Sequence, residues 1–319
     1  MTRPKVLYTF FKMIGLCPFA ISKNGKFRFS YSGVFYSIAL ASVSFFCYMK
    51  AMKNRLAFIK PRQTTMFLVA DILAKSTAFL TAVTTWLIFA FRQNRFRSLQ
   101  KSFNKFSEAC IVFGVCDGPR YLMKNGTILA VICNVAWGSV LVCGHLQHSK
   151  SSTYQFLTWL LFNFGRIIYP NLTIIFFIAM SLVKERFRLL NDAIGQLSSV
   201  NLGRQAIRKK NGKNRSRIKF LDETDSLSAY IQLRSELVEL TTSGVNFLSV
   251  PIYFAMAAYI LELTSALYVI SLNIKYEQFW WEKNGTYFWA LNVWQICQII
   301  GLITLLTVAD STGQEVLFF

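Results

Sequence analysis

The chain has 319 residues, of which 54% are hydrophobic and only 16% are charged, and its formal net charge is +20. A soluble domain carries about 25% charged residues, and the apolar residues here gather in long runs instead of recurring at the spacing of an amphipathic helix or strand. The composition therefore excludes an ordinary soluble protein and indicates one that spans a membrane.

Six runs are long and apolar enough to cross a bilayer as helices, because a crossing needs about 20 mostly apolar residues. In chain order they are residues 31–52, 66–91, 127–147, 156–183, 245–271 and 287–309. None alternates with a period of two, which argues against the strands of a membrane barrel. The predicted fold class is therefore all-α, a polytopic bundle of six transmembrane helices that forms a single membrane domain over residues 1–319.

The Lys and Arg residues outside the spans predict the orientation. The amino-terminal segment and the two loops 92–126 and 184–240 hold 25 of them, whereas the alternate segments hold 8. Cytoplasmic loops accumulate Lys and Arg, so we expect both loops and the amino terminus to be cytoplasmic. The early apolar stretch is not a convincing signal peptide, because Lys12 interrupts it.

The basic run RQAIRKKNGKNRSRIK, residues 204–219, is the strongest candidate for a contact with nucleic acid. It lies between two spans and contains neither interleaved aromatic residues nor a recognised binding motif. A flexible cytoplasmic loop near anionic lipid explains its charge better. We therefore expect membrane lipid, and no nucleic acid, among the partners.

Two segments of the 184–240 loop and its borders carry apolar residues at helical spacing. They are LVKERFRLLNDAIGQL, residues 182–197, and DSLSAYIQLRSELVELTTSGVNF, residues 225–247. We expect them to continue spans four and five into the cytoplasm as helices. The alternative is a pair of short helices that lie on the membrane surface.

Four ionisable residues fall well inside predicted spans: Asp71 and Lys75 in span two, Arg166 in span four and Glu262 in span five. Each costs at least about 2.5–3.5 kcal/mol at a helix centre, so each needs a partner or water. With a rise of about 1.5 Å per residue, Lys75, Arg166 and Glu262 lie about 13–15 Å below the outer ends of their spans. This common level predicts a polar, ligand-binding cavity open to the outside; the alternative is a set of ion pairs that only holds the helices together.

Aromatic and amide side chains at comparable depth would line such a cavity: Trp137, His145, Trp159, Asn163, Tyr259 and Asn292. The predicted ligand site consists of the four charged residues with Trp159 and Tyr259. His145 and His148 have the spacing of two metal ligands but lack a third, so no metal site is predicted. The chain contains no catalytic or cofactor-binding motif, and we therefore expect no enzyme activity and no cofactor.

Three segments resemble the insect gustatory receptors. They are FKMIGLCPF near the amino terminus, LVKERFRLLNDAIGQL after span four and WQICQIIGLITLLTVADSTGQEV at the end. Within them, the group Arg186, Phe187, Leu190 and Asn191 and the spacing from Ser311 to Glu315 are the most specific features. The individual motifs are loose, and it is their order along nearly the whole chain that carries the resemblance.

The resemblance implies a seven-span, ligand-gated cation channel of the plasma membrane that assembles as a homo- or hetero-tetramer and responds to small-molecule tastants. It also implies a ligand pocket in the outer half of the bundle and subunit contacts in the cytoplasmic extensions. The family's seventh, pore-lining span, with a Thr-Tyr pair followed by Gln-Phe, has no counterpart in this sequence. We therefore expect a subunit that lacks the pore helix and does not conduct alone.

Two other functions remain open from the residues. An insect odorant receptor is the nearest, since it belongs to the same superfamily. The second is a six-span secondary transporter, because Pro170 and Pro251 interrupt two spans. No repeat between spans one to three and spans four to six supports the transporter.

Overall fold

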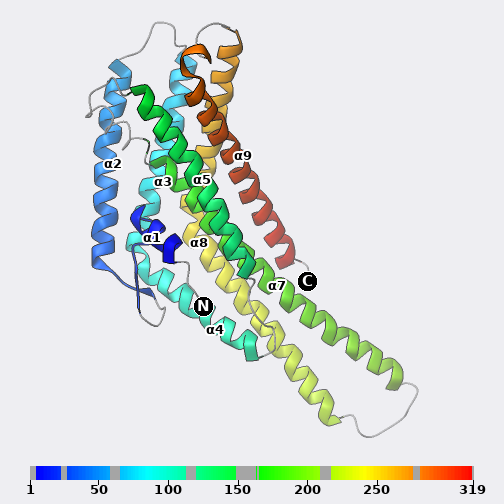
Figure 1. The fold of residues 1–319 in the computed structure, drawn as a ribbon. Coiled ribbons are helices and arrows are strands. Elements are labelled where there is room, and N and C mark those ends of the chain that lie inside the picture. The colour runs from blue at the N-terminus through cyan, green and yellow to red at the C-terminus, as the bar shows by residue number, and fades with distance from the viewer. Residues whose placement is uncertain are drawn as a thin grey trace.

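The computed structural model describes residues 5–22, 27–57, 65–112, 120–148, 163, 165–208, 217–275 and 281–317, which form an elongated helical bundle (Figure 1). Its first elements are α1 (Lys5–Met13), the strands β1 (Ala20–Ile21) and β2 (Phe27–Arg28), α2 (Tyr31–Ala57) and α3 (Thr65–Phe91). They are followed by α4 (Gln93–Val112), α5 (Arg120–His148), the 3-10 turn η1 (Gly165–Ile167), α7 (Ile168–Arg208), α8 (Arg217–Lys275) and α9 (Trp281–Leu317).

Six helices, α2, α3, α5, α7, α8 and α9, are long and apolar enough to cross a membrane. They confirm the predicted all-α bundle of six spans. Within the described residues the only strands are β1 and β2, which pair Ala20 with Arg28 and Ile21 with Phe27. The start of the fourth predicted span, up to residue 162, lies outside the described residues, and η1 leads directly into α7.

α7 and α8 continue well beyond their spans. They contain 41 and 59 residues, which corresponds to about 60 Å and about 90 Å of helix, whereas the apolar core of a bilayer is about 30 Å thick. Figure 1 shows their far ends side by side below the rest of the bundle. The predicted helical continuation is confirmed, and two separate surface helices are excluded.

The predicted connection between spans two and three, residues 92–126, is largely helical, because α4 occupies residues 93–112. This helix was not predicted from the sequence. The segment has a low mean hydropathy, which hid it from a search for spans, but Phe96, Leu99, Phe106 and Cys110 recur at helical spacing. Phe106 and Cys110 are buried against Phe187 on α7 and Leu237 on α8. α4 is therefore an amphipathic helix that covers the extensions of α7 and α8.

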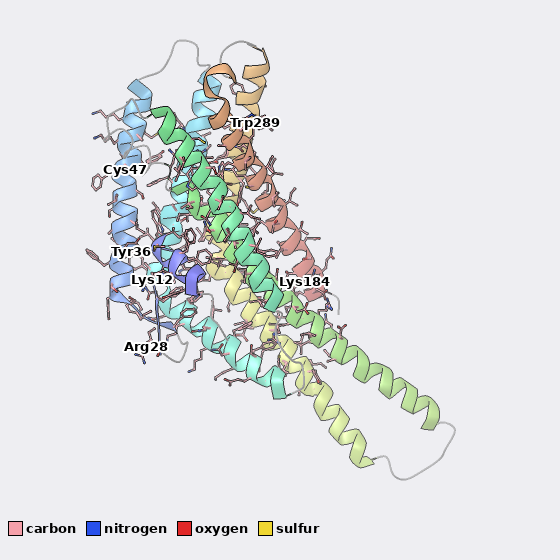
Figure 2. All side chains as sticks on the ribbon, viewed as in Figure 1. Lys12, Arg28, Tyr36, Cys47, Lys184 and Trp289 are labelled. Carbon is pink, nitrogen blue, oxygen red and sulfur yellow. The ribbon has the colours of Figure 1, made fainter. Side chains whose placement is uncertain are left out.

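The centre of the bundle is built from large side chains of five helices. Trp137 on α5, Tyr169 on α7, Tyr259 on α8 and Trp294 on α9 are at most 2% exposed, and they belong to one cluster with residues of α3 such as Phe89. Many apolar side chains on the outer surface are instead exposed, as lipid-facing residues are, including Phe35, Phe46, Val135 and Ile303. Figure 2 shows the side chains on the bundle, with Trp289 toward the upper end of α9.

The amino-terminal helix is held against the second span. The Trp86 indole N–H on α3 donates to the carbonyl of Ile14 at 2.9 Å. Gly15 has a φ of +81°, which favours glycine, and a Cβ there would come within 2.7 Å of the Trp86 Nε1 atom. A close approach of the backbone to Trp86 therefore requires glycine at this turn.

The last turns of α9 are fixed to the extensions of α7 and α8. The Asn191 amide donates to the carbonyl of Glu315 at 3.3 Å, and the Arg234 guanidinium donates to the carbonyl of Val316 at 2.7 Å. Carbonyl groups at a helix end have no partner within their own helix. These two contacts satisfy two of them. The first contact also joins Asn191 and Glu315, which belong to the two sequence features that carried the resemblance to gustatory receptors most specifically.

Candidate ligand-binding site

A buried ion pair joins two helices inside the bundle. The Nε atom of Arg166, in η1 at the start of α7, lies 2.7 Å from the Oε1 atom of Glu262 on α8. Within a membrane an unpaired charge is costly, so the two residues compensate each other. The prediction that Arg166 and Glu262 lie at one level of the bundle is confirmed.

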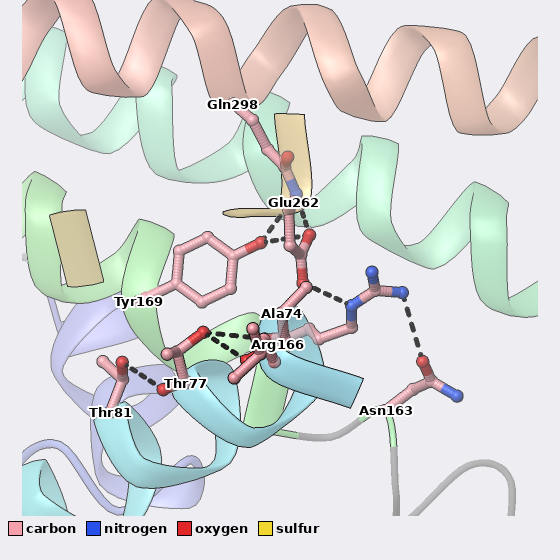
Figure 3. A network of polar contacts seen from close by, with 9 residues as sticks. Ala74, Thr77, Thr81, Asn163, Arg166, Tyr169, Glu262 and Gln298 are labelled. Carbon is pink, nitrogen blue, oxygen red and sulfur yellow. Dashed lines mark hydrogen bonds and ion pairs between the residues drawn. The ribbon is translucent and has the colours of Figure 1, made fainter. Parts of the chain in front are cut away.

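Glu262 accepts two further hydrogen bonds on its second carboxylate oxygen. The Tyr169 hydroxyl on α7 donates to Oε2 at 2.8 Å, and the Gln298 amide on α9 donates to the same atom at 2.5 Å. The Gln298 amide also lies 2.6 Å from the Tyr169 hydroxyl. Figure 3 shows these groups converging on the carboxylate from three helices. Glu262 is thereby a junction between α7, α8 and α9.

Arg166 differs from its partner because it is partly open. Its side chain is 19% exposed, whereas that of Glu262 is 0% exposed. The guanidinium also donates to the Asn163 side-chain oxygen at 3.3 Å and lies 6.0 Å from the ring centre of Trp137. A guanidinium at this distance from an indole is stabilised by the ring's electrons. Arg166 is therefore held on several sides while part of it remains accessible.

Tyr259 lies next to this junction and is itself buried. Its ring meets that of Tyr169 edge to face, with centroids 4.8 Å apart, and its hydroxyl donates to the Thr173 hydroxyl at 3.3 Å. A Cβ at Gly301 on α9 would lie 2.7 Å from the Tyr259 hydroxyl. Glycine at this point lets α9 approach Tyr259 closely.

Two buried polar atoms beside the junction have no hydrogen-bond partner in the described structure. They are the Trp294 indole nitrogen and the Gln298 side-chain oxygen, both on α9 and four residues apart. The Trp294 ring lies against Trp137, with centroids 4.9 Å apart. A donor and an acceptor of this kind are costly to leave unsatisfied in a buried site.

The family profile of the 7tm chemosensory receptors matches residues 5–317. The chain belongs to the 7tm chemosensory receptor family. No curated protein matches it significantly. The assignment covers almost the entire chain and includes the whole of the described junction. Because this is a family of receptors and not of enzymes, the receptor is a multi-pass membrane protein without enzyme activity, as predicted.

The structure places three of the six residues in the predicted site of the receptor close together. Arg166 and Glu262 are paired, and Tyr259 reaches them through Tyr169. Lys75 is half-buried on α3 and takes no part in the contacts described above. The Asp71 side chain and all of Trp159 lie outside the described residues, as do the His145 and His148 side chains.

Sequence reasoning missed Tyr169 and Gln298, although both bind Glu262. A signal was present for Gln298, since a glutamine in the middle of an apolar span is costly unless it is paired. Asn134 and Asn171 carry the same signal, and their side chains exchange hydrogen bonds of 3.0 and 3.1 Å between α5 and α7. Tyr169 gave no signal, because tyrosine is common in spans and at their ends.

Proposed function

We propose that the chain is a gustatory receptor subunit of an insect ligand-gated cation channel, and that it binds a small-molecule tastant beside Arg166 in the outer half of the bundle. The observation that carries this proposal is the asymmetry of the ion pair, in which Glu262 is sealed and Arg166 is partly exposed. Glu262 has no oxygen left without a donor. Its role is therefore to hold Arg166 in place, while Arg166 presents its guanidinium to the ligand.

The site is suited to coupling because its residues lie on the helices that continue into the extensions. Arg166 lies in η1, which directly precedes α7, while Glu262 lies on α8 and Gln298 on α9. A ligand that draws Arg166 away from Glu262 changes the contacts between all three helices. Lys75 and Asp71 on α3, Tyr259 on α8 and Trp159 complete the proposed pocket.

We propose that the receptor lies in the plasma membrane, as the resemblance to gustatory receptors implies. The Lys and Arg distribution supports a cytoplasmic amino terminus. In this orientation the Arg166–Glu262 level lies in the outer half, where a tastant arrives. We also propose a homo- or hetero-tetramer, with subunits meeting at the extensions of α7 to α9. Epitope tags at the amino terminus and in the α8–α9 connection, detected with and without permeabilisation, test the orientation.

The test measures tastant binding and delivery to the cell surface separately. The receptor is expressed with and without partner subunits, its surface level is measured by biotinylation, and tastant binding to the purified chain is followed by tryptophan fluorescence. Arg166→Lys keeps the charge but loses the planar guanidinium. We expect this substitution to reduce tastant binding more than surface delivery.

The double variant Arg166→Gln with Glu262→Gln is the control for a purely structural ion pair. Removing both charges leaves neither of them buried alone, so surface delivery should recover relative to either single variant. If tastant binding recovers together with delivery, the ion pair only holds the bundle and the proposal is wrong. Binding that stays lost supports the role of Arg166.

An odorant receptor remains the second candidate, because the family assignment covers chemosensory receptors in general. Soluble tastants and volatile odorants distinguish the two in the same binding assay. The buried charges in the site favour a ligand with hydrogen-bonding groups and therefore a tastant. The transporter alternative finds no support in the family comparison.

A further inference from the structure

A groove of about 470 Å³ lies between α4 and α8, well away from the ion pair. α4 contributes Arg95, Ser102 and Lys105 to one wall, and α8 contributes Glu236, Glu239 and Ser243 to the other. Sites for small molecules have volumes of about 300–1,000 Å³. The groove is therefore large enough to receive a ligand.

The floor of the groove is apolar and its rims are polar. Phe106 is buried, and Leu99 and Leu240 are half-buried, so these side chains form the floor. The charged and hydroxyl side chains of the rims are exposed. Phe106 and Leu240 belong to the apolar cluster that α4 forms with the extensions of α7 and α8. The residues of the rims therefore stand on packed helices.

The two rims carry opposite charges that do not pair with each other. Arg95 and Lys105 stand on α4 and Glu236 and Glu239 on α8, and among the described residues no ion pair joins one rim to the other. The four charges sum to zero. An anion would meet the two carboxylates and a cation would meet Arg95 and Lys105, so the arrangement matches a molecule that carries both charges.

We propose that this groove binds the ethanolamine phosphate headgroup of a membrane phospholipid. The phosphate is recognised by Arg95 and the adjacent serine hydroxyls, and the primary ammonium is recognised by Glu239. A quaternary ammonium is usually held by several aromatic faces, but Phe106 is the one aromatic residue in the lining and is 3% exposed. Carboxylate and hydroxyl oxygens instead accept hydrogen bonds, which a primary ammonium donates and choline does not.

The position of the groove indicates that the headgroup comes from a lipid. Arg95 follows Phe91, the end of the second candidate span, by four residues, or about 6 Å of helix. At the same level the rings of Phe96 and Phe247 lie 5.9 Å apart. α8 runs toward the fifth predicted span, residues 245–271, so Glu239 is farther from that span than Ser243. A lipid presents its phosphate nearer the membrane and its ammonium farther out, which is the order of Arg95 and Glu239.

The experiment measures which lipids the full chain retains. The purified receptor is equilibrated with equal amounts of phosphatidylethanolamine, phosphatidylcholine and phosphatidylglycerol, and bound lipid is counted by native mass spectrometry. We expect phosphatidylethanolamine to be retained about fivefold over each of the others, the ratio that corresponds to one partly shielded charged contact. Arg95→Gln should weaken retention, and Glu239→Gln should remove the preference over phosphatidylcholine.

Arg97→Gln and Glu108→Gln are matched controls, because both residues are exposed on α4 and outside the groove lining. They remove the same charges and should leave the lipid preference unchanged. Equal retention of the three lipids, or an equal effect of Arg97→Gln and Arg95→Gln, overturns the proposal. Stronger retention of phosphatidylglycerol that rises further in Glu239→Gln overturns it in favour of an anion site.

Free O-phosphoethanolamine, added in excess, distinguishes the headgroup alone from the intact lipid. Displacement of phosphatidylethanolamine supports recognition of the headgroup itself. A preference that persists without displacement supports binding of the headgroup only as part of a lipid. Both results are independent of the proposed tastant site, since Arg95 and Glu239 take no part in it.

Discussion

The bundle around Glu262 and the helical extensions below it use charge in opposite ways. In the bundle, ionisable residues are few, and the partly exposed Arg166 pairs with the fully buried Glu262, which also accepts hydrogen bonds from Tyr169 and Gln298. In the extensions of α7 and α8, Arg188 is exposed, Lys184 and Arg234 are half-buried and Arg186 is buried. The pair between Arg188 and Glu185 is long, at 3.8 Å. Stability in the extensions comes instead from an apolar cluster of Phe106, Phe187 and Leu237.

The difference follows from the surroundings of each region. Lipid offers no hydrogen bonds, so a charge in the bundle persists only where protein atoms satisfy it. Water and ions screen the exposed charges on the extensions, so a residue such as Arg188 tolerates exchange. The comparison therefore predicts large effects for polar substitutions in the bundle. In the extensions it predicts large effects for buried apolar residues and small effects for exposed charges.

The largest effect is expected for Glu262→Gln. The new amide would place its own donor among three donors, and Arg166 would be buried without its counter-ion. Breaking a buried ion pair in this way costs about 3–5 kcal/mol. Thermal unfolding of the purified receptor in detergent, followed by size-exclusion fluorescence, measures the loss.

Arg166→Gln is the companion variant. In this variant Glu262 keeps the hydrogen bonds from Tyr169 and Gln298. The loss of stability should therefore be smaller than for Glu262→Gln. An equal loss in both variants would show that these two donors do not stabilise the carboxylate.

Leu237→Ala should have the next largest effect on stability, and this effect should be confined to the extensions. Leu237 is fully buried between α4 and α7, and truncation of such a leucine costs about 2–5 kcal/mol. We expect increased proteolysis and hydrogen exchange in α4 and the adjoining parts of α7 and α8, with the Arg166–Glu262 region still protected. Loss of protection in both regions together would contradict the separation of the two.

The sequence predicted the elements whose signal is local. Six apolar runs predicted the spans, and rare charges within them predicted that Arg166 and Glu262 share a level, because depth along a helix follows from residue number alone. Rotation about the helix axis and the choice of neighbours do not follow in this way. Hence the contact of Glu262 with Tyr169 and Gln298 required the packed bundle.

α4 was missed for a different reason. Its low mean hydropathy made it resemble a loop, while its apolar residues are sufficient to cover the extensions of α7 and α8. An amphipathic helix of this kind depends on a tertiary partner for its stability. The helical spacing that revealed the extensions of α7 and α8 is also present here, in Phe96, Leu99, Phe106 and Cys110.

Asn134→Leu tests a neutral polar contact in the bundle and should have an intermediate effect. It removes the amide pair with Asn171, which is 1% exposed and would then lose one donor and one acceptor. Asn171 keeps its hydrogen bond to the carbonyl of Ile167, so we expect a loss of about 1–2 kcal/mol in thermal unfolding. Adding Asn171→Leu should recover part of the loss, because no amide then remains unpaired.

The smallest effect is expected for Arg188→Gln, which sharpens the comparison from the side of the extensions. The Arg188 side chain is 60% exposed, and its distance of 3.8 Å to Glu185 is at the limit of an ion pair. Exposed pairs within one helix contribute about 0.3–0.5 kcal/mol or less. The midpoint of unfolding should therefore stay within about 1–2 °C of the parent chain. A shift as large as that of Asn134→Leu would mean that charges on the extensions are structurally as important as polar groups in the bundle, and the contrast between the two regions would fail.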